Sequence, residues 1–215
     1  MVAGATGLVG REILAALLAD KSVKAVHSLG RRKIDLQHPK LVQHVVDFAN
    51  LKNVPAVDDV FIALGTTIKV AGSQAAFRAV DFDAVVTLAG AARAQGAARL
   101  GVVSAMGASA KSPIFYNQVK GEMEAALLTL DYVSVNIAQP SMLAGDRAAL
   151  DQPLRSGEGL ALRVTRWLKP LIPANYQPVQ AADVAAGLLR AVRVGNPGVH
   201  RILSGALQGA AAAES

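Results

Sequence analysis

The chain has 215 residues, of which 52% are hydrophobic and 18% charged, with a formal net charge of +6 and no cysteine. This length and composition predict one packed domain, 1–215, and exclude a disordered or collagen-like chain. The lack of cysteine excludes disulfides and thiol catalysis. No apolar run reaches the roughly 18 residues of a membrane-spanning helix, and no signal peptide precedes the first glycine, so we expect a soluble cytoplasmic protein.

Short apolar runs alternate with helical stretches, which is the pattern of βαβ units in a parallel sheet covered on both faces. The strands are expected at 1–3, 25–29, 42–46, 59–64, 99–104, 133–138 and 200–203. The helices are expected at 8–20, 73–95, 116–130, 159–168 and 181–192. The pattern therefore predicts an α/β protein with a parallel sheet.

A glycine-rich segment, Gly4 to Gly10, follows the first strand and opens an amphipathic helix. At such a helix start, free N–H groups and the helix dipole favour an anion such as a pyrophosphate. Gly4 would permit the tight turn, Gly7 the approach of phosphate and Gly10 the packing of the helix on the sheet, while Thr6 adds a hydroxyl donor. The spacing differs from the G-x-G-x-x-G fingerprint, and an ordinary glycine turn is the alternative. We interpret the segment as a dinucleotide site.

The residues after the second strand indicate which dinucleotide binds. Sites that select NAD place an acid about 20 residues beyond the glycines, whereas a 2′-phosphate calls for arginine. Arg31 and Arg32 stand here, and no acid does. Guanidinium groups bind phosphate bidentately, so NADP(H) is predicted, with a solvated loop pair as the alternative. After the third strand, Asp47 and Phe48 are candidates for adenine contacts, although an Asp there is also a common helix cap.

The basic residues are otherwise scattered, and the one cluster, at 31–33, has no aromatic residue that could stack on a base. We therefore expect a small anionic ligand and no nucleic-acid partner. The four histidines have no metal-ligand spacing, so no metal site is predicted.

Three residues form a candidate catalytic group. Ser104 ends the fifth expected strand, and Tyr116 and Lys120 follow on one face of the next helix. Hydride transfer to a carbonyl must be matched by proton delivery to its oxygen, and a tyrosine performs this task near neutrality when a nearby cation stabilises its phenolate. Lys120 would supply the cation, and Ser104 would donate a hydrogen bond to the carbonyl oxygen. The alternative is a partly buried tyrosine and a solvated lysine.

The glycine spacing, this trio and segment 180–185 resemble the short-chain dehydrogenase/reductase superfamily, in particular its atypical, extended-like members. Segments 64–69, 79–83 and 115–122 look closer still to the TIP30 (HTATIP2) oxidoreductase-like family. The resemblance implies a Rossmann doubly wound parallel sheet with helices on both faces, a small C-terminal substrate portion at about 144–180, and NADPH as cofactor.

The resemblance also implies contacts to the nicotinamide half of the cofactor. They would come from two segments, one after the fourth strand and one after the sixth: Leu64, Gly65, Thr66 and Thr67, and Pro140, Ser141 and Met142. Gln139 stands where relatives usually carry arginine, which leaves the polarity of the pocket open. The other predicted cofactor contacts are Gly4, Thr6, Gly7, Leu8, Val9, Arg31, Arg32, Asp47, Phe48, Tyr116 and Lys120.

Two functions fit these residues. The first is an NADP(H)-dependent oxidoreductase that transfers hydride to or from a carbonyl or hydroxyl of a small-molecule substrate. The second is an NADP(H)-sensing regulatory protein that binds a protein partner. Segment 146–176 offers few groups that could hold a polar metabolite, which motivates the second function; a substrate of the first is expected to be largely apolar. The basic, apolar stretch 159–171 could contact an anionic membrane, but at this length it is more often a lid or a partner interface.

Overall fold

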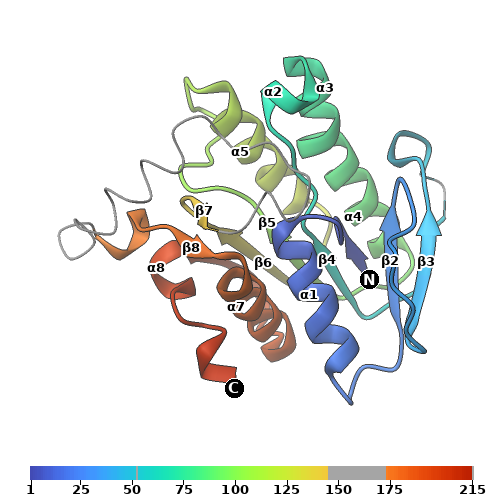
Figure 1. Cartoon of the computed structure of the whole chain (residues 1–215). Coiled ribbons are helices and arrows are strands. Elements are labelled where there is room, and N and C mark those ends of the chain that lie inside the picture. The colour runs from blue at the N-terminus through green and yellow to red at the C-terminus, as the bar shows by residue number, and fades with distance from the viewer. Residues whose placement is uncertain (52, 145–172, 215) are drawn as a thin grey trace.

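A computed structural model of the chain describes residues 1–51, 53–144 and 173–214. At its centre lies a seven-stranded sheet with the order β3-β2-β1-β4-β5-β6-β9, in which every neighbouring pair is parallel (Figure 1). This arrangement confirms the predicted Rossmann-type α/β fold. Because the order of the strands reverses between β1 and β4, a ligand crevice is expected outside their carboxyl ends.

The strands of the central sheet are β1 Val2–Ala3, β2 Val26–Gly30, β3 Leu41–Val45, β4 Asp59–Ile62, β5 Arg99–Val103, β6 Ser134–Gln139 and β9 Gly198–Leu203. A separate parallel pair consists of β7 Leu143–Ala144 and β8 Val179–Gln180. The α-helices are α1 Leu8–Ala19, α2 Ile68–Ala71, α3 Gln74–Arg78, α4 Ala84–Ala94, α5 Phe115–Leu127, α7 Ala181–Val194 and α8 Ser204–Leu207. The described residues also form a π-type segment, Ala79–Asp83, and the 3-10 segments Phe48–Asn50, Ala174–Tyr176 and Ala212–Glu214.

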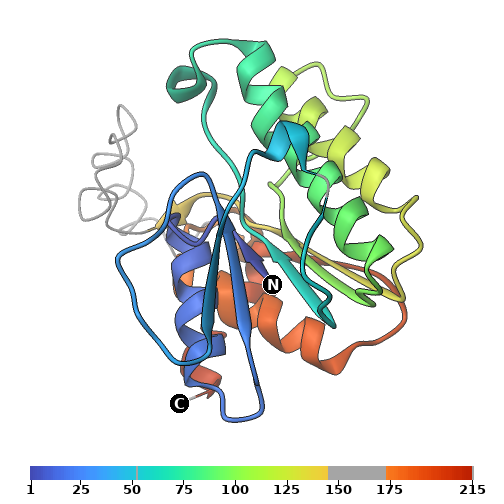
Figure 2. The ribbon, with the colours of Figure 1, turned by 90° about the vertical axis from the view of Figure 1, so that its right-hand side faces the viewer.

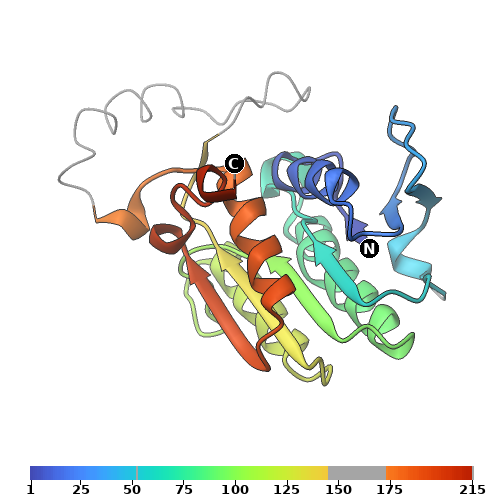
Figure 3. The same cartoon turned by 90° about the horizontal axis from the view of Figure 1, so that it is seen from below.

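Helices cover both faces of the sheet. Helices α1 and α7 lie on one face, and α4 and α5 lie on the other (Figures 2 and 3). Ile13 and Leu188 belong to the first core, and Leu88 and Met123 to the second; all four side chains are fully buried. Strands that are buried on both faces are apolar along most of their length, which is why inner strands such as β4 and β5 appear as apolar runs in the sequence, whereas the edge strands β3 and β9 are partly exposed.

The helix expected at 73–95 is interrupted. Between α3 and α4 the chain makes a wide turn of π type at Ala79–Asp83, and the helix then continues. One extra residue in a turn changes the direction of the side chains within it. Here the wide turn directs Asp81 into the protein interior, where its side chain is 1% exposed.

The helix expected at 159–168, and most of the substrate portion at about 144–180, lie outside the described residues. The same holds for the stretch 159–171 that was considered for membrane contact. Among the described residues, no helix combines the length and the hydropathy that crossing a membrane requires.

Candidate functional site

In the turn between β1 and α1, backbone segments approach each other so closely that two of the residues must be glycine. Gly4 has a φ of +86°, and a Cβ there would lie 2.4 Å from the carbonyl oxygen of Ala63. A Cβ on Gly10 would lie 2.0 Å from the carbonyl oxygen of Gly4. Real atoms do not approach this closely, so any side chain would force the backbone apart. The glycine pattern therefore reports a tight turn that packs the start of α1 against β1 and β4.

The start of α1 has no side-chain cap. Gly7 is the N-cap residue, and its amide donates to the carbonyl oxygen of Gly4 at 2.9 Å. Leu8 and Val9 bury their side chains in the core, so their backbone N–H groups are what they offer to a ligand. Thr6 is exposed beside them. An uncapped helix start with free amides fits a pyrophosphate.

Arg31 and Arg32 follow the carboxyl end of β2, next to this turn in the sheet. Both side chains are exposed, and neither has a hydrogen-bond or ion-pair partner within the described part of the chain. Two unpaired guanidinium groups beside a helix start suit a ligand with an additional phosphate.

Asp47 and Phe48 follow β3 and form the start of a short 3-10 helix. The Asp47 carboxylate caps this helix, accepting from the Ala49 amide at 3.0 Å and from Asn50 Nδ2 at 2.6 Å. These hydrogen bonds, first from Asn50 and then from Ala49, hold the pKa of Asp47 below its usual range. Phe48 packs against the α4 side of the core. The capping role that the sequence left open for Asp47 is thus present.

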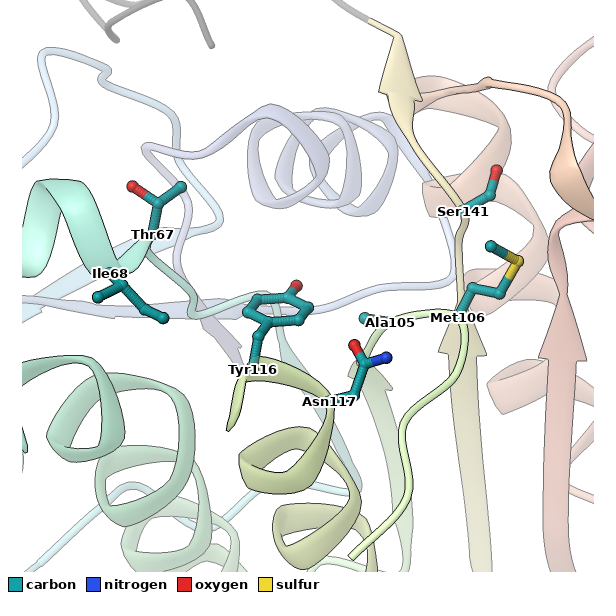
Figure 4. Close-up of a pocket in the computed structure, with 7 residues that line it drawn as sticks. All are labelled: Thr67, Ile68, Ala105, Met106, Tyr116, Asn117 and Ser141. Atoms are coloured by element: carbon teal, nitrogen blue, oxygen red, sulfur yellow. The ribbon is translucent and has the colours of Figure 1, made fainter. Parts of the chain in front are cut away.

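Tyr116 lies in a pocket of about 370 Å³ at the carboxyl ends of β4, β5 and β6 (Figure 4). Figure 4 shows its hydroxyl directed into the space between the Thr67 side and the Ser141 side. The ring packs against the buried Phe77, with 5.4 Å between ring centroids, which fixes its direction. The pocket is lined by Thr67, Ile68, Ala105, Met106, Tyr116, Asn117 and Ser141.

Lys120 lies one turn further along α5 and is buried, with its side chain 4% exposed. Its ammonium nitrogen lies 2.7 Å from Asp81 Oδ1. The other carboxylate oxygen of Asp81 accepts from the Thr66 amide at 2.9 Å. The pair therefore ties α5 to the segment after β4, directly beneath Gly65, where a Cβ would lie 3.9 Å from Lys120 Nζ. Asp81 was not predicted as a site residue.

The structure corrects the expected position of Ser104. Its hydroxyl donates to Glu124 Oε1 at 2.6 Å, inside the protein, and the residue is 4% exposed. Successive residues of an extended chain point to opposite sides. Ala105, the next residue, therefore takes the place in the pocket wall that was expected for Ser104.

Glu124 is a buried carboxylate at the centre of a small polar cluster. Besides Ser104, it accepts from Gln139 Nε2 at 2.8 Å and from Arg201 Nε at 3.2 Å. Gln139 thus faces Glu124 and does not line the pocket. Arg201 comes from the neighbouring strand β9.

The remaining predicted contacts surround the pocket without lining it. Leu64 packs against the α4 side of the core. Pro140 accepts from the Met106 amide, and Met142 accepts from the Val179 amide, each at 2.9 Å. Of the three residues after β6, Ser141 is the one that reaches the pocket. In the part of the chain that the structure describes, no three acidic or histidine side chains gather as a metal site would require.

The glycine turn, the uncapped start of α1 and the pocket beyond it are the features of a dinucleotide-binding protein with a Rossmann-type fold. The sequence profile of a family described as NAD(P)H-binding matches residues 4–139. The chain belongs to this NAD(P)H-binding family, and its cofactor is accordingly NAD(P)H.

Curated relatives support the resemblance to TIP30. Protein HTATIP2 of Rattus norvegicus is 35% identical over 167 residues, which cover 74% of this chain and 67% of that protein. The protein named FMP52, mitochondrial, of Coccidioides immitis is 31% identical over 211 residues, covering 87% and 84%. The FMP52 protein of Candida albicans is 29% identical over 192 residues, covering 85% and 82%. These names overturn the expectation of a cytoplasmic protein, because the FMP52 relatives are named as mitochondrial.

Solved structures of low sequence identity share the fold. MoeE5 in complex with UDP-glucose and NAD has a TM-score of 0.68 at 16% identity, over 94% of this chain and 74% of that one. The human epimerase family protein SDR39U1 with NADPH has a TM-score of 0.61 at 16% identity, over 94% and 72%. At such identities the likeness establishes the Rossmann-type fold alone.

Proposed function

We propose that this protein is an NADP(H)-dependent oxidoreductase that interconverts a carbonyl and an alcohol on a largely apolar small molecule. The observation that carries the proposal is the hydroxyl of Tyr116, which points into the pocket (Figure 4). A bound nicotinamide would supply or accept the hydride, and the substrate oxygen then needs a proton partner. A phenol is a stronger acid than the alcohols of Thr67 and Ser141, so we assign the proton transfer to Tyr116.

Lys120 would act as a fixed positive charge below the pocket. It lies four residues after Tyr116, on the same face of α5, and its ion pair with Asp81 holds the ammonium in place. A charge that is already oriented costs no reorganisation when negative charge develops on the substrate oxygen. Ser104 has no part in this proposal, because its hydroxyl is held by Glu124.

The cofactor would lie across the carboxyl ends of β1 and β4. The amides at the start of α1 would bind the pyrophosphate, and Arg31 and Arg32 the 2′-phosphate. Asp47 and Phe48 are candidates for the adenine end, and the segments 64–67 and 140–142 for the nicotinamide half. Carbon atoms of Ile68, Ala105 and Met106 form much of the pocket wall, which supports an apolar substrate.

A Tyr116→Phe variant tests the proposal. The protein is given NADPH with para-nitrobenzaldehyde, cyclohexanone or menadione, and oxidation of NADPH is followed by absorbance. We expect kcat of the variant to fall by about 100-fold or more, because the proton donor is lost. The Kd for NADPH, measured by fluorescence titration, should change by less than about threefold, because the other contacts that bind the cofactor are retained.

The matched control is Tyr176→Phe, which removes the hydroxyl of a tyrosine that is 64% exposed and does not line the pocket. Its kcat and its Kd for NADPH should equal those of the wild type. Wild-type turnover no faster than that of Tyr116→Phe would contradict an oxidoreductase. Unchanged NADPH binding would then favour the sensing function and a protein partner.

A further inference from the structure

The pocket lacks the serine hydroxyl that the sequence placed opposite Tyr116. Ser104 directs its hydroxyl at Glu124, and Ala105, which lines the pocket, offers only a methyl group. The oxygen of a carbonyl that is being reduced gains negative charge, and a second hydrogen-bond donor besides the phenol stabilises it. Among the described residues, the donor would have to come from another polar residue of the pocket wall.

Two of the three other polar residues in the wall are less well placed to donate, Ser141 because its proton is used and Thr67 because of its position. Ser141 Oγ donates to the Gln177 carbonyl oxygen at 2.6 Å and accepts from Ser204 Oγ at 3.0 Å. The oxygen of Thr67 accepts from the Val70 amide at 3.1 Å and caps α2, on the opposite side of the Tyr116 ring from Ala105 (Figure 4).

Asn117 is placed differently. Its side-chain amide has no hydrogen-bond partner within the described residues, and it faces the pocket next to Tyr116. Figure 4 shows the amide on the side of Ala105 and Met106, which is the side expected for the serine hydroxyl. An amide nitrogen carries two N–H donors and stays neutral, so it can stabilise an oxyanion without exchanging a proton.

The loop after β5 holds Asn117 in this position. The backbone oxygen of Asn117 accepts from the Ser109 amide at 3.0 Å. Gly107 has a φ of +76°, and a Cβ there would lie 3.1 Å from Asn117 Nδ2, so the loop approaches the amide closely. Gly121 permits a second close approach, because its Cβ would lie 2.1 Å from the backbone of Ser109. These contacts restrict where the amide can move.

We propose that Asn117 donates, through Nδ2, the hydrogen bond that orients and stabilises the substrate carbonyl oxygen. The proposal rests on the oxidoreductase function proposed above. In the reduction, hydride is added to the carbonyl carbon, the C=O π electrons move to oxygen, and Tyr116 gives that oxygen its proton. Asn117 keeps its own protons throughout.

The test compares Asn117→Ala with a matched control on the same helix, Gln118→Ala. Gln118 also carries an amide, but its Nε2 donates to Glu122 at 2.9 Å and it does not line the pocket. For para-nitrobenzaldehyde and NADPH, kcat of Asn117→Ala should fall by about 100-fold, as when one oxyanion donor is removed. Gln118→Ala should equal the wild type. Both variants should keep the wild-type Tm and Kd for NADPH.

A second substitution separates a catalytic role from a structural one. Ala105→Ser, added to Asn117→Ala, places a hydroxyl in the pocket wall and should recover at least about tenfold in kcat. Equal kcat for Asn117→Ala and Gln118→Ala would overturn the proposal, as would failure of Ala105→Ser to restore any activity.

The role of Asn117 can also be measured without turnover, so that its test does not depend on whether the protein is an oxidoreductase. NADP⁺ and para-nitrobenzaldehyde form a complex that cannot react, and the infrared carbonyl stretch of the bound aldehyde reports its hydrogen bonds. The stretch should move to higher frequency in Asn117→Ala and stay unchanged in Gln118→Ala. If no probe is reduced by the wild type, the oxidoreductase function fails, while this shift still decides the role of Asn117. An identical stretch in all three proteins would overturn it.

Discussion

The turn after β1 and the segment after β5 lie at the same edge of the sheet, yet they contribute to the site in different ways. The turn after β1 offers backbone amides, and its shape follows from glycines that no other residue could replace. The segment after β5 depends on which of two neighbouring side chains faces the pocket. Ser104 faces Glu124 and Ala105 faces the pocket. A site made of backbone amides can therefore be recognised from its glycine pattern. A site made of side chains depends on which residue of the strand end points into the pocket, and a shift of one residue changes that.

The strongest test of the backbone half is Gly10→Ala. The new Cβ would lie 2.0 Å from the carbonyl oxygen of Gly4, so β1 and α1 must move apart, and we expect a loss of about 3 kcal/mol or a failure to fold. Urea unfolding measures the change. Gly90→Ala is the control, because its Cβ would meet only ordinary contacts, 3.9 Å from Leu130, within α4. Equal midpoints for the two variants would show that the turn is not tight.

The expected contact of Arg31 and Arg32 with the 2′-phosphate, beside the same turn, is tested by replacing both arginines with alanine. We expect the Kd for NADPH to rise by about 10- to 100-fold, which is about 1.4–2.8 kcal/mol, because the 2′-phosphate loses its guanidinium partners. The Kd for NADH should stay unchanged. Isothermal titration measures both, with Lys33→Ala as the control. Equal weakening for the two cofactors would contradict the assignment to the 2′-phosphate.

In the segment after β5, Ser104→Ala tests where the Ser104 hydroxyl lies: in the pocket, as expected from the sequence, or against Glu124, as in the structure. Glu124 would lose a buried donor, so we expect a loss of about 2 kcal/mol in the free energy of unfolding. The loss in kcat should be far smaller than that of Tyr116→Phe. A large drop in kcat with unchanged stability would mean that the hydroxyl reaches the pocket after all, and the contrast between the two segments would disappear.

The smallest effect is expected for Arg201→Ala. The side chain of Arg201 is 45% exposed, and exposed ion pairs contribute little, so we expect a loss of about 0.5–1 kcal/mol by thermal unfolding. Glu124 would keep its hydrogen bonds from Ser104 and Gln139. A loss larger than that of Ser104→Ala would indicate that Glu124 depends on the guanidinium of Arg201 more than on the hydroxyl of Ser104.

Much of the fold was predictable from the sequence, for a physical reason. Inner strands such as β4 and β5 are largely buried, so they appear as apolar runs, and the expected ends of the seven sheet strands differ from the observed ones by at most two residues. The placement of Tyr116 and Lys120 on one face of α5 follows from helical periodicity, because they are four residues apart. These features depend on local repeats that a single sequence contains.

The partners of the site residues were not predictable in this way. Asp81 pairs with Lys120 across 39 positions of sequence, and no local repeat connects the two. The pairing of Ser104 with Glu124 is hidden for the same reason, and with it the fact that Ala105, and not Ser104, faces the pocket. A search for polar residues next to Tyr116 in the sequence would have found Asn117, but not its direction.

The wide turn at 79–83 has a consequence for how this helix tolerates insertions and deletions. Removing one residue there would turn the segment into a regular α-helix in which the two flanking halves keep nearly the same relative direction, while the side chains within the former wide turn point elsewhere. The helix α4 would stay on the sheet, but the carboxylate of Asp81 would swing away from Lys120. The buried ammonium would then lose its counterion, although every residue of α5 remained in place. The length of this helix is thus as much a determinant of the site as the residues within it.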